Sequence, residues 1–136
     1  MLLKKEIYTM KRHEARSKAM QVLFQLDNTA ELTLDEAIGH VLDGEKSDSF
    51  FESLVRGATE KKQEIDEALE GKLENWSLYR LPKIERTVLR LAVYELLYME
   101  ETPNNVVLNE AIELCKTYGD DKSSKFVNGV LSKFVE

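Results

Sequence analysis

Basic side chains concentrate at the N-terminus of this chain. The first eighteen residues contain six of them against Glu6 and Glu14, a net charge of +4, whereas the whole chain is −6 and residues 19–136 therefore carry −10. The six are Lys4, Lys5, Lys11, Arg12, Arg16 and Lys18. A positive segment on an anionic body attracts a polyanion to one place and repels it elsewhere. The pattern indicates ion pairing with an anionic partner, and a solvated, frayed terminus is the alternative.

Residue types suited to catalysis or metal binding are sparse. Cys115 is the single cysteine, and His13 and His40 are the two histidines. One cysteine cannot form an internal disulfide and fits a reducing, cytoplasmic environment, and the set offers no zinc ligands. The sequence has neither a G-x-G-x-x-G nor a P-loop motif. We therefore expect a binding protein without catalytic residues, metal or cofactor.

Helices must position the basic side chains, because apolar residues recur with helical spacing along most of the chain. In the first helix they occupy positions 15, 19, 22, 23 and 26, on one face. Cations at the N-terminal end of a helix oppose its macrodipole, which favours anions there by roughly 0.3–1 kcal/mol per charge. A basic cluster in this place costs stability, which favours an anion-binding role.

Further helices follow from capping and breaking signals. Thr33–Glu36 and Ser49–Glu52 have the spacing of capping boxes, and the second predicts one long helix ending near Gly71. Pro82 fits the first turn of a helix that continues to about Glu100. Two more helices cover about 105–118 and 121–134. The pattern predicts an all-α, single compact domain of about six or seven helices. No apolar run is long enough to cross a bilayer, and no secretory signal precedes the helices.

The helix after Pro82 is apolar over much of its circumference, as is typical of a central helix. Its charged residues are expected to form a solvated stripe: Glu85, Arg86, Arg90 and Glu95. In the last helix Gly129 predicts a close approach between helices, because glycine costs about 1 kcal/mol there relative to alanine.

Several segments resemble the family of the bacterial transcription antitermination factor NusB. They cover residues 10–27, 84–97, 109–116, 118–121 and 125–132 in the order and spacing of that family. The resemblance implies two packed helical bundles joined through a long central helix. Residues 1–9 precede the usual family start at Met10 and are expected to be an N-terminal extension, disordered or produced by an alternative start or by cloning. Residues 10–136 form the RNA-binding domain.

The resemblance also implies a function. The family binds the boxA element of nascent RNA, mainly rRNA leaders, together with NusE, a small-subunit ribosomal protein. That complex helps RNA polymerase to read past terminators. The expected partners are therefore boxA RNA, NusE and the RNA polymerase antitermination complex, with no membrane, and the protein is a monomer or a homodimer.

The resemblance also implies which residues form the binding site, by their positions in the sequence. The basic first helix of the family corresponds to Lys11, Arg12, His13 and Arg16, with Lys18 as a looser candidate, and these would neutralise phosphates. Phe126 matches a family position near the RNA and would stack on a base, although its helical phase fits a core residue equally well. Lys122 and Lys125 flank it. Glu85 and Arg86 match the surface that faces NusE.

Two other functions compete with this interpretation. Within the same fold, the RNA-binding domain of rRNA cytosine methyltransferases is similar, but these 136 residues hold no methyl-donor domain. From another class, a helical adaptor would bind protein only, without RNA.

His13 stands where the family often has arginine, so the basic cluster is weaker at neutral pH.

Overall fold

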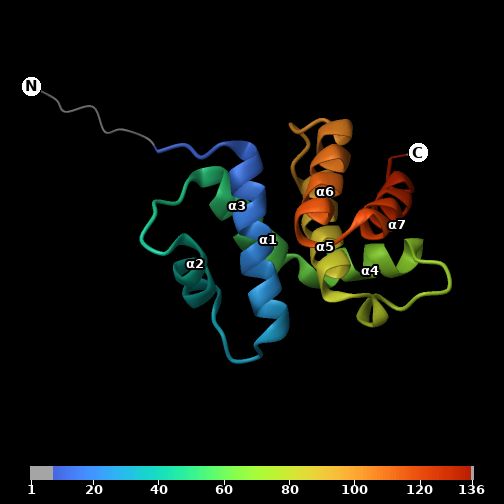
Figure 1. Ribbon diagram of the computed structural model, residues 1–136, viewed down its shortest axis with the longest axis horizontal. Helices are drawn as coiled ribbons and strands as arrows, with labels where there is room; N and C mark the ends of the chain where they lie inside the picture. Colours follow the sequence, from blue (N-terminus) through green and yellow to red (C-terminus); the bar gives the residue numbers. More distant parts are fainter. Residues whose placement is uncertain (1–7, 136) are drawn as a thin grey trace, which may run out of the picture.

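The computed structural model describes residues 8–135, and within that range it contains seven α-helices, one 3₁₀ turn and no strand (Figure 1). The elements are α1 (Arg12–Asn28), α2 (Leu34–Leu42), α3 (Ser49–Glu60), α4 (Lys62–Lys72), η1 (Leu78–Arg80), α5 (Lys83–Tyr98), α6 (Asn104–Tyr118) and α7 (Asp121–Ser132). The predicted all-α class and the number of helices are confirmed. The predicted extension at residues 1–9 falls outside the described residues except for Tyr8 and Thr9.

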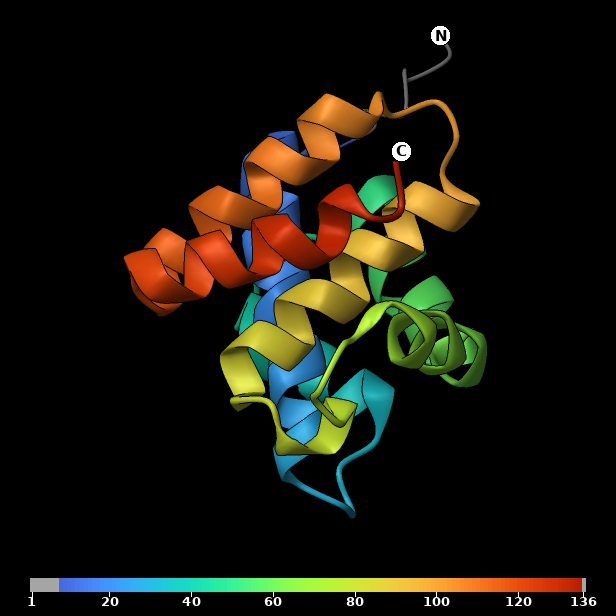
Figure 2. The same ribbon diagram turned by 90° about the vertical axis from the view of Figure 1, so that its right-hand side faces the viewer.

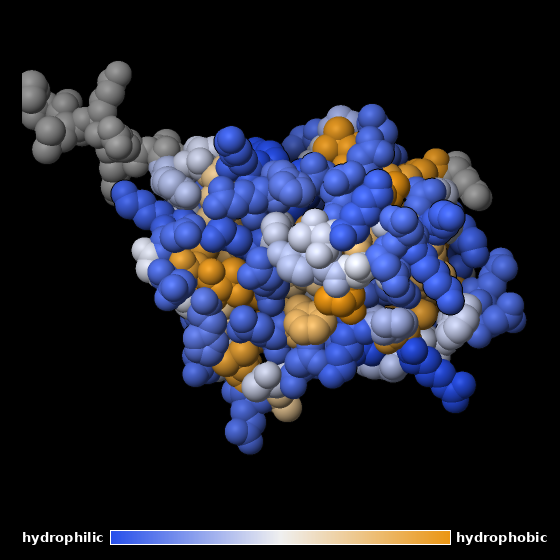
Figure 3. Space-filling view, viewed as in Figure 1, coloured by the Kyte–Doolittle hydropathy of each residue, from blue (hydrophilic) through white to orange (hydrophobic). Residues whose placement is uncertain are grey.

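Helix α5 is the central element. It packs against α1, α3, α4, α6 and α7. Helices α2 and α3 both pack on α1, and α7 packs on α6 (Figures 1 and 2). The molecule thus has two helical bundles that share α5, as the resemblance implies. The charged surface around them has small, separated apolar patches on the face shown in Figure 3.

Local capping explains where the helices begin. The Glu36 amide donates to Thr33 Oγ1 and the Thr33 amide donates to Glu36 Oε1, both at 3.1 Å, which confirms the first capping box. The second box is wrong by one residue. Asp48 is the N-cap of α3 and accepts a hydrogen bond from the Phe51 amide at 2.8 Å. Ser49 is instead the first residue of the helix.

The long helix predicted from Ser49 to Gly71 is also wrong, because the chain breaks at Lys61. This residue has φ −95° and ψ 14° and lies between α3 and α4. The break lets the two segments bury different faces. Helix α3 packs on α1 and α5, whereas α4 packs on α5 and η1. In a single straight helix of that length, residues 62–72 would not reach α5 and η1.

Glycine marks a close contact in α3 and not in α7. A Cβ on Gly57 would lie 1.9 Å from the hydroxyl oxygen of Tyr94, so the Tyr94 side chain lies across the bare backbone of α3. Gly129 has no atom within 4 Å of the equivalent position and is exposed. The expected close approach at Gly129 is therefore wrong.

Candidate nucleic-acid interface

The first turn of α1 presents basic side chains to solvent. Lys11, Arg12 and His13 are all exposed. The backbone entering this turn is fixed by a hydrogen bond from the Met10 amide to Asp48 Oδ2 at 2.8 Å. Asp48 is buried and at the same time caps α3. One carboxylate therefore holds the first turn of α1 against the start of α3.

The guanidinium of Arg12 lies on the ring of Phe50, the second residue of α3. Its central carbon is 3.9 Å from the ring centroid. Phe50 is only 7% exposed, whereas Arg12 is exposed. Within residues 8–135, no side chain or carbonyl accepts a hydrogen bond from the Arg12 guanidinium. The exposed guanidinium is therefore a candidate to contact an anionic ligand.

Arg16 lies one turn further along α1 and is buried. Its Nε donates to both carboxylate oxygens of Glu95 at 3.1 and 2.9 Å, and Nη2 donates to Oε1 at 2.9 Å. The two side chains are 4% and 2% exposed. The expected phosphate contact does not fit this placement, because binding RNA would require breaking a buried ion pair. Arg16 instead fixes α1 to α5.

His13 is exposed and Lys18 is half-buried, and each already has an acidic partner. His13 Nδ1 is 2.8 Å from Glu110 Oε2 on α6. Lys18 Nζ is 2.9 Å from Glu45 Oε2 and 3.9 Å from Glu14 Oε1. The hydrogen bond to Glu45 raises the pKa of Lys18. Lys18 contributes to the positive field, but a phosphate that approached either side chain would compete with these carboxylates.

The start of α7 forms a second cluster of candidate residues. Lys122 and Lys125 are exposed and Phe126 is half-buried. The Phe126 ring meets the ring of Trp76 edge to face, with centroids 6.4 Å apart. Trp76 is 55% exposed, so an aromatic pair reaches the surface here. A hollow of about 420 Å³ beside it is lined by both rings, Arg80, Leu81, Pro82, Glu85, Asp120, Lys122 and Ser123.

Glu85 and Arg86 take different positions on α5. Glu85 is half-buried and accepts a hydrogen bond from Ser123 Oγ at 2.9 Å, which joins it to the start of α7. Arg86 is 7% exposed, and its Nη2 donates to Asp27 Oδ2 at 2.6 Å. Its Nη1 donates to the carbonyl of Tyr79 at 3.1 Å. A surface role is open to Glu85, whereas the Arg86 guanidinium is directed into the protein.

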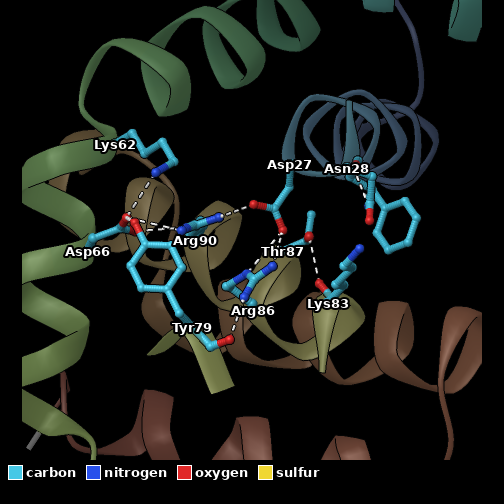
Figure 4. A network of polar contacts seen from close by, with 10 residues as sticks. Asp27, Asn28, Lys62, Asp66, Tyr79, Lys83, Arg86, Thr87 and Arg90 are labelled. Atoms are coloured by element: carbon cyan, nitrogen blue, oxygen red, sulfur yellow. Dashed lines mark hydrogen bonds and ion pairs between the residues drawn. The ribbon is translucent and has the colours of Figure 1, made fainter. Parts of the chain in front are cut away.

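Arg86 belongs to a buried ionic network that joins α1, α4 and α5 (Figure 4). Arg90 Nη1 donates to Asp27 Oδ1 at 3.1 Å, and its Nε donates to Asp66 Oδ1 at 2.8 Å. Lys62 Nζ adds a third cation, 3.2 Å from Asp66. The expected solvated stripe on α5 is therefore wrong for three of its four members. Arg86, Arg90 and Glu95 are buried because carboxylates or guanidinium groups on other helices neutralise them.

The network shifts the proton equilibria of its members. Burial alone would raise the pKa of Asp27, but the hydrogen bonds and charges of Arg86 and Arg90 outweigh it and lower that pKa. Burial alone would lower the pKa of Arg90, and its bonds to Asp66 and Asp27 raise it instead. Both shifts keep the groups charged near neutral pH.

The two candidate clusters do not form one continuous site. Helix α6 packs against both α1 and α7 and lies between them in the view of Figure 1. Its first half faces the basic turn through Glu110, and its end meets the middle of α1, where Tyr118 Oη accepts a hydrogen bond from Gln21 at 2.7 Å. A ligand that reached both clusters would therefore pass across α6.

Sequence reasoning missed Phe50, Asp48 and Trp76 as parts of these surfaces. Phe50 and Phe51 are adjacent aromatics at the start of a helix. In the structure both are buried, and Phe50 lies under Arg12. The two adjacent phenylalanines were the only feature of the sequence that could have indicated that both rings are buried.

Other kinds of site find no support in the described part of the chain. Residues 8–135 contain no group of three or more His, Cys, Asp or Glu side chains able to hold a metal ion. Cys115 is fully buried, and burial raises the pKa of its thiol to about 12, so it is not a nucleophile. No described helix is long and apolar enough to cross a membrane.

Comparison with known proteins gives consistent results. The NusB family model matches residues 13–136. The transcription antitermination protein NusB of Lysinibacillus sphaericus is 72% identical over 127 residues, which cover 93% of this chain and 98% of the relative. Its counterpart in Bacillus subtilis is 54% identical over 123 residues, covering 90% and 93% respectively.

Solved structures agree with the sequence matches. NusB of T. maritima is 36% identical, with a TM-score of 0.85 over 93% of this chain and 92% of that one. A crystal structure of the antitermination factors NusB and NusE in complex with double-stranded RNA contains a chain that is 34% identical. Its TM-score is 0.82, over 92% of this chain and 97% of that one.

Proposed function

Because this chain belongs to the NusB family, we propose that it is a transcription antitermination factor that binds boxA RNA of rRNA leaders together with NusE. The observation that carries the proposal is the exposed basic first turn of α1 on a chain with a net charge of −6. The similarity to a protein solved with NusE and RNA supports the same pair of partners. An RNA-binding regulator of this kind is not an enzyme.

Fewer residues of α1 are assigned to RNA contacts than the charge pattern alone suggests. Lys11 and Arg12 are exposed at the start of α1, whereas His13 and Lys18 each contact a carboxylate and are secondary. Arg16 supports this turn from inside. A few phosphate contacts give affinity that falls with salt, by about 0.7 in log–log slope per phosphate for a single strand. Such contacts position the RNA and leave base choice to other groups.

The surface around the start of α7 is the proposed meeting place of NusE and RNA. It offers the Trp76–Phe126 aromatic pair, Lys122 and the Glu85 carboxylate around one hollow, with the exposed Lys125 next to Phe126 in the sequence. Polar rims around exposed aromatics are typical of protein interfaces. Arg86 is assigned a supporting role, because it binds the carbonyl of Tyr79 and so fixes η1 beside this hollow.

The wider setting follows from the family assignment. The protein is proposed to act in the cytoplasm as part of the antitermination complex on RNA polymerase. A monomer and a homodimer are both compatible with this role, and sedimentation at increasing protein concentration would distinguish them.

A salt titration tests the proposal. A single-stranded boxA RNA is titrated with the chain alone and with the chain mixed with NusE, at several salt concentrations. Binding that tightens with NusE and weakens with salt is expected. Binding of NusE without any RNA affinity, alone or in the mixture, would identify a protein-only adaptor and overturn the proposal.

A further inference from the structure

We propose that Arg12 and Phe50 form a stacking site for one unpaired RNA base, so that the first turn of α1 recognises a base and not only phosphates. The inference rests on the RNA binding proposed above. It assigns Arg12 a role in choosing the RNA and gives Phe50 the role of a positioning residue beneath it.

The geometry of the pair is that of two stacked planes. The central carbon of the guanidinium lies 3.9 Å from the centre of the Phe50 ring. An edge-on guanidinium would point an N–H group at the ring and hold its central carbon farther away, so this separation indicates nearly parallel planes. One face of the guanidinium is covered by the ring, and the other faces outward because Arg12 is exposed.

The surroundings hold the Phe50 ring in place. Phe50 is 7% exposed and lies two residues after Asp48, whose carboxylate accepts hydrogen bonds from both the Phe51 amide and the Met10 amide. The guanidinium of Arg16 lies 5.1 Å from the same ring and is itself held by Glu95. The support for Arg12 is therefore built from buried groups before any ligand arrives.

The chemistry of this arrangement favours a base. A phosphate requires only a positive charge, which a mobile lysine supplies. A guanidinium fixed on an aromatic ring presents a flat, weakly hydrated face on which a base can stack, and single-stranded RNA is commonly read in this way. The edge N–H groups remain able to donate to the base or to its phosphate. Lys11, the residue before Arg12, is exposed and supplies additional charge.

A double-mutant cycle with abasic RNA tests the proposal. Wild type, Arg12→Lys and Phe50→Leu are titrated, with NusE present, against boxA RNA and against the same RNA with one base removed at successive positions. Arg12→Lys keeps the charge and removes the plane. Phe50→Leu keeps an apolar core side chain and removes the ring. Lys11→Ala is the matched control, since it removes a charge without touching the stack.

The expected result is a coupling at one RNA position. Arg12→Lys weakens binding of the intact RNA about tenfold with an unchanged salt slope, and removing the stacked base abolishes the difference from wild type. Phe50→Leu shows the same coupling with a smaller loss. Lys11→Ala weakens all RNAs equally and lowers the salt slope.

Two outcomes would overturn the inference. If Arg12→Lys binds the intact RNA within twofold of wild type, or weakens every abasic RNA to the same extent, no base stacks on Arg12. Arg12 is exposed, so this variant tests the stack even where Phe50→Leu disturbs folding. If wild type binds no RNA at all, the proposed function itself fails, and that result is distinct because it appears before any substitution.

Discussion

Arg12 and Arg16 lie one turn apart on the same helix and near the same aromatic ring, yet their surroundings are opposite. Arg12 is 3.9 Å from the Phe50 centroid and open to solvent, whereas Arg16 is 5.1 Å from it and 3% exposed. The difference comes from α5, which supplies Glu95 to Arg16 and nothing to Arg12. A cluster of basic residues in a sequence is therefore a mixture of binding groups and structural groups, and carboxylates elsewhere in the chain separate them.

The largest expected effect is on stability, at the buried Arg16. Arg16→Ala leaves the Glu95 carboxylate buried without its partner and should lower the free energy of unfolding by about 3–5 kcal/mol. Urea unfolding followed by circular dichroism measures it. The double variant Arg16→Met with Glu95→Leu should recover most of the loss, because the uncompensated charge is gone. A loss below about 1 kcal/mol for Arg16→Ala would show that the pair contributes little.

The second buried ionic site should respond to pH as well as to substitution. Asp27→Asn removes the charge that Arg86 and Arg90 share and should cost about 1–3 kcal/mol at neutral pH. The pKa of Asp27 is lowered in the folded state, so its stabilisation is complete above the unfolded value near 3.9 and is lost as pH falls through the lower, folded value. The gap in stability between wild type and the variant should therefore close on acidification. A gap independent of pH would contradict the assignment.

Arg12, the exposed arginine, should contribute to RNA binding and hardly at all to stability. Arg12→Ala should change the free energy of unfolding by no more than about 0.5 kcal/mol, because no described carboxylate loses a partner. RNA affinity should fall by more than the roughly tenfold loss expected for Arg12→Lys, because the charge is lost as well as the plane, and the salt slope should decrease. Fluorescence anisotropy with labelled boxA RNA measures both. If Arg12→Ala lowered stability and left RNA binding unchanged, Arg12 would be a structural residue and not an RNA-binding one.

The smallest effect is expected at the exposed ion pair between α1 and α6. Glu110→Gln removes the partner of His13, whose side chain is 57% exposed. Stability should fall by about 0.2–1 kcal/mol at most, since exposed pairs contribute little. RNA affinity should rise slightly, because the variant removes a negative charge beside the basic turn. An RNA affinity equal to that of the wild type would show that this pair lies away from the RNA.

Sequence patterns predicted the helices well because helical periodicity records which face of each helix is buried. The cap of α3 was misplaced because Asp48 and Ser49 are both good N-cap residues, and only the hydrogen bond to the Phe51 amide decides between them. The break at Lys61 has no proline or glycine at that position to signal it.

Burial of charged residues was the part that sequence could not supply. Arg16 and Glu95 are 79 residues apart, and Arg86 and Asp27 are 59 apart. Nothing local to either residue shows that its partner will arrive from another helix. The same holds for Phe50, whose contact with Arg12 appears only when α1 and α3 are packed together.

Cys115 gives the molecule an internal reporter of its own opening motions. It is the single cysteine, it is fully buried on α6, and its pKa of about 12 keeps the thiol protonated. A thiol reagent can therefore modify the native protein only when the helices around Cys115 separate. The labelling rate would then give the free energy of that opening, without any probe added to the chain. A rate that slows when NusE binds would show that the partner steadies the C-terminal bundle.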